Sequence, residues 1–138
     1  MMRTFNRQMH TNMIIARIAN PYGPGQDYSK GLGFIDAVMK HSMHHEEIDI
    51  WGDGSIIRDY IYIADVCGML EILINYKGEE EVFNGGSGQG TSQKEISRVA
   101  KEIVPDIKTK YLTARPIDVS RIILDYQKLM YIKKNVLL

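Results

Sequence analysis

The hydrophobic and polar residues of this chain follow two spacings, which together predict an α/β fold. The continuous apolar run over residues 13–16 is typical of a strand buried on both faces in a parallel sheet. Residues 81–84 and 107–111 have the pattern of further short strands, the second near a sheet edge. Helical spacing predicts a helix over residues 32–42, one capped by Asp65 and ended by Gly78, one between Ser92 and Pro105, and a last one capped by Asp125.

Two β-rich runs within residues 48–65 flank the pair Asp53-Gly54. This pair tolerates the positive φ angles of a tight turn, so we expect the two runs to form a β-hairpin. Apolar isoleucines alternate with polar or aromatic residues in the first run, as they do in a half-buried strand. The hairpin is therefore the centre of the predicted fold.

The expected hairpin carries one arginine, Arg58, among the aromatic residues Trp51 and Tyr60. A guanidinium group beside flat rings suits a ligand that is half phosphate and half base. From these residues alone, a second interpretation is open, in which Arg58 pairs with Asp59 and the aromatic rings fill the core. The sequence pattern does not decide between the two.

The segment over residues 20–26 combines two prolines and two glycines and follows the expected strand at residues 13–16. We expect a fixed loop here, because this composition propagates neither helix nor strand. Ligands in open α/β sheets bind at the carboxyl ends of strands, which is where this loop would lie.

Two other segments invite a functional interpretation that their spacing does not support. The glycine run over residues 85–90 does not fit GxGxxG, and Ser92 with Glu95 forms a capping box after it, so a structural turn is expected. The histidines and glutamates over residues 41–47 lack a metal-binding spacing and predict a solvated helix end. Cys67 lies in the pattern of an apolar helix face and is expected to pack in the core.

Composition narrows the range of functions. The 138 residues carry 17 basic and 17 acidic side chains, so the charge indicates neither nucleic acid nor an anionic membrane as partner. The single cysteine excludes an internal disulfide and agrees with a reducing compartment. No apolar run reaches the ~18 residues of a membrane span, and there is no signal-peptide pattern. We expect a soluble, cytoplasmic chain.

Three strings of residues carry a resemblance to a known family. The string Trp-Gly-Asp-Gly-Ser-x-x-Arg-Asp-Tyr-Ile-Tyr over residues 51–62 resembles the extended short-chain dehydrogenase/reductases that act on nucleotide sugars, UDP-glucose 4-epimerases above all. The string Asn-Pro-Tyr-Gly-Pro-Gly-Gln at residues 20–26 is similar to the family's loop between cofactor and substrate. The family's Arg-Pro-Gly-Asp loop is matched at residues 115–118, where Ile117 replaces its glycine. The resemblance covers only the carboxyl-terminal part of a family member.

The resemblance implies roles for individual residues. Arg58 and Arg115 would neutralise the substrate diphosphate, with a hydrogen bond from Asn20. Asp118 would accept from the ribose, Tyr60 would lie beside ribose and phosphate, and the strand ending at Trp51 would line the uracil. The remaining implied residue is Pro21, on the cofactor side of the loop.

The resemblance also implies an architecture, a cofactor and a reaction. Residues 1–26 would be the end of a Rossmann-like dinucleotide-binding sheet with its connecting loop, and residues 27–138 the substrate-binding region. In the family, NAD takes a hydride from sugar C4 of UDP-glucose or UDP-galactose and returns it to the other face. The NAD-binding glycine motif and the catalytic Tyr-x-x-x-Lys pair are expected upstream of residue 1, because no tyrosine here is followed by lysine four positions later.

Two alternatives and one physical consequence follow from this interpretation. The chain could instead belong to a nucleotide-sugar dehydratase, decarboxylase or reductase, or be a non-catalytic remnant that binds a UDP-sugar. Without the expected upstream residues we predict that the chain has no activity of its own. The strand at residues 13–16 would also lack neighbours, which predicts self-association through it.

Overall fold

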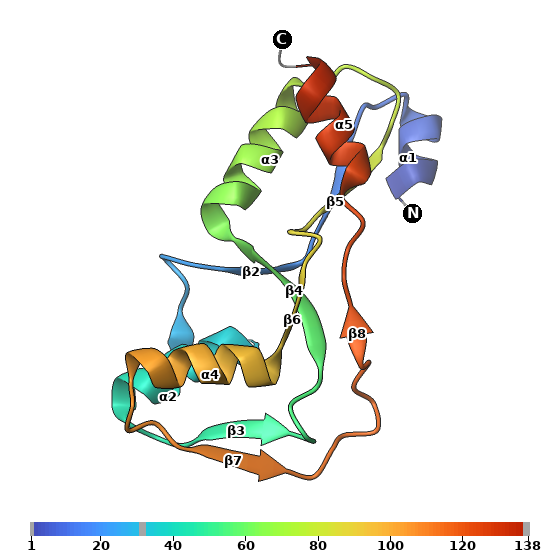
Figure 1. Ribbon diagram of the computed structural model, residues 1–138. Helices are drawn as coiled ribbons and strands as arrows, with labels where there is room; N and C mark the ends of the chain where they lie inside the picture. Colours follow the sequence, from blue (N-terminus) through green and yellow to red (C-terminus); the bar gives the residue numbers. More distant parts are fainter. Residues whose placement is uncertain (1, 31–32, 137–138) are drawn as a thin grey trace.

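The structure is a computed structural model that describes residues 2–30 and 33–136, and it has a mixed α/β fold (Figure 1). Its elements follow one another in the order α1 (Met2–Met9), β1 (Ile15–Ile18), β2 (Asn20–Tyr22), η1 (Tyr28–Lys30), α2 (Phe34–His44), β3 (Ile48–Trp51), β4 (Ile57–Tyr62), α3 (Ile63–Asn75), β5 (Val82–Gly85), β6 (Gly90–Ser92), α4 (Gln93–Ile103), β7 (Thr109–Leu112), β8 (Arg121–Ile122) and α5 (Gln127–Val136).

The described strands form three small sheets, and four of the five pairings among them are parallel. β1 pairs with β5, and β3 pairs with β7, each as a parallel two-stranded sheet. The four-stranded sheet is built around β4, which pairs with β2 and β8 in parallel and with β6 in antiparallel orientation. β4 therefore links segments that are far apart in the sequence.

The expected hairpin at Asp53-Gly54 is wrong, although both of its strands exist. β3 and β4 lie in different sheets, because β7 pairs with β3 while β2, β6 and β8 pair with β4. The connection has two glycines with positive φ, Gly52 at 72° and Gly54 at 76°, and the Asp53 carboxylate accepts from the Ser55 N–H at 2.9 Å. This turn redirects the chain between sheets instead of folding it back.

The Pro-rich segment after β1 also differs from the expectation of a loop. Residues Asn20–Tyr22 form the short strand β2, in parallel register with Tyr60–Tyr62 of β4. A proline is tolerated there because β2 pairs on only one side among the described residues. The pairing sets Asn20 opposite Tyr60.

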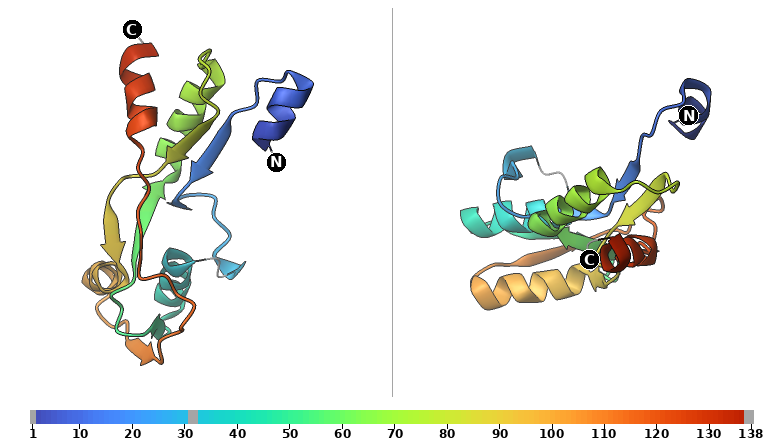
Figure 2. Two further views of the ribbon diagram at one scale, coloured as in Figure 1. Left: turned by 90° about the vertical axis from the view of Figure 1, so that its right-hand side faces the viewer. Right: turned by 90° about the horizontal axis from the view of Figure 1, so that it is seen from above.

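Two hydrophobic clusters hold the molecule together. The first joins α2, β3 and α4 through buried Val38, Ile48, Ile50 and Ala100, together with Ile107. The second joins α3, β5 and α5 and consists of the buried residues Ile72, Leu73, Phe83, Leu129 and Ile132. The elements of each cluster stay together in both views of Figure 2. The four-stranded sheet lies between the clusters (Figure 1).

The helices agree with the sequence in place and differ in detail. The helix expected over residues 32–42 is α2, which begins at Phe34 and continues to His44, while residue 32 lies outside the described residues. Asp65 is not the N-cap of α3, because that helix begins at Ile63 and Asp65 lies in its first turn. The same helix ends at Asn75, before the expected stop at Gly78.

The apolar side chains of α3 are only partly buried. Cys67 is exposed, not packed in the core, and Leu70 and Ile74 are 40% and 78% exposed. Val66, Ile72 and Leu73 are the buried residues of α3. Ile72 and Leu73 belong to the cluster that also contains residues of β5 and α5. Apolar side chains of α3 are therefore partly open to solvent.

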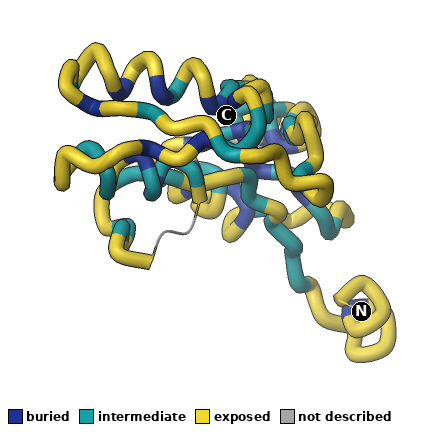
Figure 3. Tube along the Cα trace, turned by 90° about the horizontal axis from the view of Figure 1, so that it is seen from below, coloured by how far each residue is buried: buried dark blue, intermediate teal, exposed yellow. Residues whose placement is uncertain are grey.

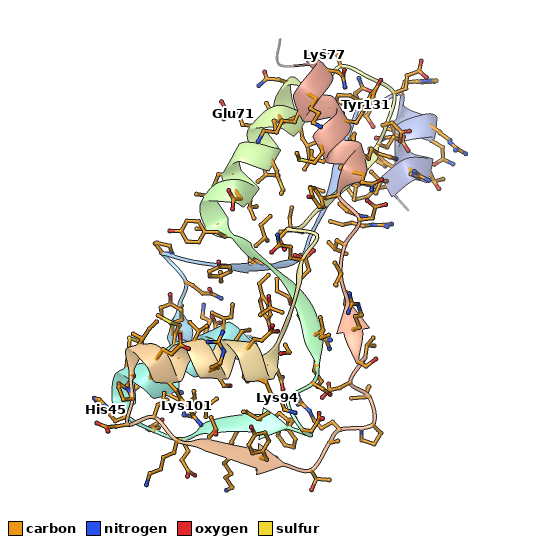
Figure 4. The ribbon with its side chains drawn as sticks, in the orientation of Figure 1. His45, Glu71, Lys77, Lys94, Lys101 and Tyr131 are labelled. Atoms are coloured by element: carbon orange, nitrogen blue, oxygen red, sulfur yellow. The ribbon has the colours of Figure 1, made fainter. Side chains whose placement is uncertain are left out.

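The α4 capping box is confirmed. The Ser92 hydroxyl accepts from the Glu95 N–H at 3.2 Å, and the Glu95 carboxylate accepts from the Ser92 N–H at 2.7 Å. At the other end of α4, Lys101 Nζ donates to Thr109 Oγ1 of β7 at 2.9 Å (Figure 4). Both ends of the helix are thus attached to the strand connections around it.

Acid should weaken the α4 capping box. The backbone N–H and then the hydroxyl of Ser92 lower the pKa of Glu95, so its stabilising effect is complete above the unfolded pKa of about 4.3 and is lost as pH falls through the lower folded value. We expect Glu95→Gln to reduce the fall in melting temperature between about pH 5 and pH 3. Glu47→Gln, at an exposed position, is the control and should leave that fall unchanged.

β1 differs from the expected strand in place and burial. It begins at Ile15 instead of residue 13, and its side chains are half-buried or exposed because β5 is its only neighbour among the described strands. α1 is almost wholly exposed (Figure 3) and is attached through Asn6, whose Nδ2 donates to Met13 O at 2.8 Å and Glu81 Oε1 at 3.0 Å. The second edge of β1 is thus unpaired within the part of the chain that the structure describes.

An unpaired strand edge favours association between copies of the chain. We expect the chain to elute from a size-exclusion column above its monomer mass of 15.8 kDa, with an apparent mass that falls on dilution. A monomer peak that does not change over a concentration series of about a hundredfold would contradict this.

Candidate functional site

The carboxylate of Asp59 in β4 is the most heavily hydrogen-bonded side chain near the predicted site. It is 1% exposed and accepts from the Ser87 N–H at 2.8 Å, the Ser87 hydroxyl at 2.6 Å, and the Gly88 and Leu124 N–H groups, both at 3.2 Å. Several donors of this kind can hold a carboxylate that has no cationic partner. Arg58 is therefore not the partner of Asp59, and the interpretation based on that pair is wrong.

Arg58 and Tyr60 point away from Asp59, because neighbouring side chains of a strand alternate between its faces. Arg58 Nη1 donates to the backbone oxygens of Ile57 at 2.8 Å and Val119 at 2.7 Å. Within the described residues these bonds use Nη1 alone, so Nε and Nη2 are available to a ligand. One nitrogen of the guanidinium thus holds it in place, and the other two can donate to a ligand.

Tyr60 lies beside this guanidinium and is half-buried. Burial raises the pKa of the Tyr60 hydroxyl, and the positive charge of Arg58 opposes part of that rise. The hydroxyl is therefore protonated at neutral pH and can donate a hydrogen bond.

Arg115 reaches the same region from the connection between β7 and β8. Its Nε donates to the Asp118 carboxylate at 3.1 Å, and its guanidinium carbon lies 4.4 Å from the ring centroid of Trp51. The stacked ring and the carboxylate orient a side chain that is 50% exposed. Arg115 is consequently held in place before any ligand binds.

The substitution of isoleucine for the family's glycine does not disturb this connection. Ile117 is not among the described non-glycine residues with positive φ, which are His10 and His45, and its side chain is 87% exposed. The Asp118 N–H donates to Arg115 O at 3.1 Å, which closes the turn. The turn therefore needs no glycine to place Arg115 and Asp118.

One cavity of about 690 Å³ brings the sequence-predicted site residues together. Arg58 and Arg115, which are distant in the sequence, both line it. The predicted residues that line the cavity are Asn20, Pro21, Trp51, Arg58, Tyr60, Arg115 and Asp118. The site predicted from the sequence is thus one continuous surface in the structure.

Asn20 lies where β2 meets β4. Its Nδ2 donates to the backbone oxygen of Asp59 at 2.7 Å, which fixes the amide beside Arg58 and Tyr60. An amide nitrogen carries two hydrogens, so the second can still reach a ligand oxygen. The parallel pairing of β2 and β4, which the sequence did not predict, produces this position.

A larger cavity of about 1570 Å³ lies among α2, α3 and α4, and it is mainly apolar. Tyr60 lines both cavities, but neither Arg58 nor Arg115 lines the larger one, whose basic residues are Lys133 and Arg98, the latter paired with Glu102. A diphosphate needs concentrated positive charge. The smaller cavity is therefore the candidate site.

Three polar residues of the smaller cavity were not predicted from the sequence. Gln26, Asp36 and Gln93 line it, and each has a buried side-chain oxygen without a hydrogen-bond partner in the structure. The one available signal was Asp36, a carboxylate between apolar residues in a helical pattern. An acidic residue in the first turn of a helix is ordinarily explained by the helix dipole, so nothing in the sequence indicated that Asp36 is buried.

The described residues offer no cradle for a dinucleotide pyrophosphate in the glycine run. The N–H groups of Ser87 and Gly88 already donate to Asp59, and a Cβ at Gly88 would lie 2.1 Å from the Tyr126 ring. Residues 2–30 and 33–136 also contain no group of three side chains able to hold a metal ion. The run is a structural turn, as predicted.

Parallel strand pairs with flanking helices define a Rossmann-like α/β protein, matching the extended short-chain dehydrogenase/reductase fold. The chain belongs to the NAD dependent epimerase/dehydratase family, whose model matches residues 1–86. Among the helices described for this chain, none has the length and apolar character needed to cross a bilayer.

Three relatives illustrate the similarity. The structure of UDP-glucose 4-epimerase with UDP-glucose from the hyperthermophilic eubacterium Thermotoga maritima has a TM-score of 0.86 at 35% identity, over 94% of this chain and 42% of that one. The dTDP-4-dehydro-6-deoxyglucose reductase of Escherichia coli is 34% identical over 69% of this chain and 30% of its own length. An Arabidopsis thaliana trifunctional enzyme that includes UDP-glucose 4,6-dehydratase is 33% identical over 91% of this chain and 19% of its own.

This chain spans less than half the length of each of these relatives. The similarity confirms the predicted family and fold class.

Removal of the Asp59 carboxylate should destabilise the chain. We expect Asp59→Ala to lower the free energy of unfolding by about 3 kcal/mol or more, because three N–H groups that bond to this buried carboxylate lose their acceptor. The measurement is urea denaturation followed by circular dichroism. Asp106→Ala, at an exposed position, is the control, and an equal effect of the two substitutions would contradict the role of Asp59.

Proposed function

We propose that this chain forms the nucleotide-sugar-binding part of an NAD-dependent nucleotide-sugar 4-epimerase, with UDP-glucose and UDP-galactose as its ligands. The observation that supports this is the shared cavity of Arg58 and Arg115, with Asn20 and Trp51 in its lining. Family membership and the similarity to a UDP-glucose 4-epimerase support the same substrate class.

The two arginines neutralise the diphosphate. Arg58 donates from the nitrogens that its backbone contacts leave available, and Arg115 donates from the nitrogens not used by Asp118. Asn20 supplies a neutral N–H donor between the strands, and the protonated Tyr60 hydroxyl supplies another. Fixed donors of this kind bind a pyrophosphate without a large ordering cost.

Trp51 and Asp118 bind the nucleoside. The backbone of β3 that ends at Trp51 lines the base, and the Trp51 ring carries the Arg115 guanidinium on its face. Asp118 holds Arg115 through one carboxylate oxygen and accepts from a ribose hydroxyl with the other.

The family uses NAD, and we place only Pro21 on the cofactor side of the site. In this proposal, residues 1–26 are the end of the dinucleotide-binding sheet with its connecting loop, and residues 27–138 are the substrate-binding region. The chain contains no Tyr-x-x-x-Lys pair, so by itself it binds the nucleotide-sugar without turnover.

Calorimetric titration with UDP-glucose tests this proposal. We expect Arg58→Ala to cost about 2–5 kcal/mol of binding, because it removes charge-assisted donors from a partly buried position. Arg115 is half exposed, so we expect Arg115→Ala to cost about 1 kcal/mol. Arg7→Ala, on the exposed helix α1, is the control and should bind as the unaltered chain does.

The titration tests whether the chain has a nucleotide-sugar site at Arg58. Binding of UDP-glucose that depends on Arg58 supports a nucleotide-sugar site. Absence of any binding would make the chain a structural remnant, and unchanged affinity of Arg58→Ala would mean that the ligand binds elsewhere.

A further inference from the structure

Asp36 is a buried carboxylate that no described contact satisfies. It lies in the first turn of α2, is 1% exposed, and neither of its oxygens has a hydrogen-bond partner in the structure. It nevertheless lines the cavity that contains Arg58 and Arg115. Burial of an unpaired carboxylate is costly, so a partner from the cavity is expected.

Two other polar side chains in the cavity lining also have a buried oxygen without a hydrogen-bond partner. Gln93 begins α4, which runs beside α2 (Figure 4), and its Oε1 is buried without a partner, as is Oε1 of Gln26. Each of these atoms is a hydrogen-bond acceptor. The cavity therefore has positively charged donors at Arg58 and Arg115. It also has a set of acceptors without partners, which consists of both Asp36 carboxylate oxygens and the side-chain oxygens of Gln93 and Gln26.

We propose, on the basis of the proposed function, that Asp36 binds a vicinal diol of the nucleotide-sugar through both carboxylate oxygens. The two oxygens of a carboxylate are spaced to accept from hydroxyl groups on adjacent carbons, and such charge-assisted bonds are the strong ones. The acceptor set repels the diphosphate, which the arginines attract.

Other ligand groups fit the acceptors less well. Uracil and thymine offer a single N–H between two carbonyl oxygens, so one Asp36 oxygen would face an acceptor. Lys40 and His41 also line the cavity, but no ion pair joins either of them to Asp36 in the structure. A diol comes from either the ribose or the hexose. A hexose diol leaves the ribose hydroxyls to Asp118, whereas a ribose diol on Asp36 would use both hydroxyl protons and leave Asp118 to hold Arg115 alone.

Two pairs of ligands distinguish these sources on the unaltered chain. Calorimetry compares UDP with 2′-deoxy-UDP for the ribose diol, and UDP-glucose with UDP-3-deoxyglucose, which lacks both vicinal diols of the hexose ring, for the hexose diol. We expect affinity to fall about tenfold or more within the pair that contains the bound diol. Equal affinities within both pairs would overturn the proposal and leave the proposed function standing, whereas a chain that binds no UDP ligand would overturn both.

The substitution Asp36→Asn connects this preference to the residue. It preserves shape but replaces one acceptor oxygen by a donor, so the discrimination seen in the unaltered chain should disappear. Asp106→Asn, outside the cavity and exposed, is the control and should retain it. Retained discrimination in Asp36→Asn would overturn the proposal.

Thermal unfolding of Asp36→Asn provides a second readout. Because the carboxylate has no internal partner, we expect the melting temperature to stay the same or rise. A clear fall would show that the fold itself pairs Asp36, which would also overturn the proposal.

Discussion

The buried carboxylate of Asp59 is the interaction on which the arrangement of the site depends. Its oxygens collect donors from the turn after β5 and from the segment before α5, and so join both to β4. The approach is so close that a Cβ at Gly86 would lie 2.3 Å from Asp59 Oδ2. Strand alternation then turns Arg58 and Tyr60 toward the cavity. A structural contact on one face of β4 thereby determines where the charge lies on the other.

The site separates charge within a chain whose formal net charge is zero. Guanidinium groups of Arg58 and Arg115 and unpartnered acceptors at Asp36 and Gln93 line one cavity. Such a surface suits a ligand with an anionic centre and neutral hydroxyl-bearing ends, which is the charge pattern of a nucleotide-sugar. The net charge of the chain did not indicate this site, because its basic side chains and its acceptors are concentrated within one cavity.

Motifs predicted the site better than local patterns predicted the fold. The strings around Arg58 and Arg115 identified residues that share a cavity, because a string preserves an arrangement formed by distant segments. Turn propensity at Asp53-Gly54 predicted a hairpin and failed, since pairing depends on which strands compete for β3 and β4. Burial of Cys67 failed for a related reason: only one side of α3 is covered. Periodicity locates an amphipathic helix but does not say how much of its apolar face has a partner.

The cavity spans the junction between the two hydrophobic clusters. Asn20 and Pro21 come from β2, next to the α3–α5 cluster, whereas Asp36 and Gln93 come from helices of the α2–α4 cluster. Among the described elements, β4 contributes to this junction, because it pairs with β2 on one side and β6 on the other. A ligand that contacts both sets of residues adds a further connection across this junction. Its binding energy would then stabilise the relative position of the clusters as well as the site, because it binds only when both sides are in place.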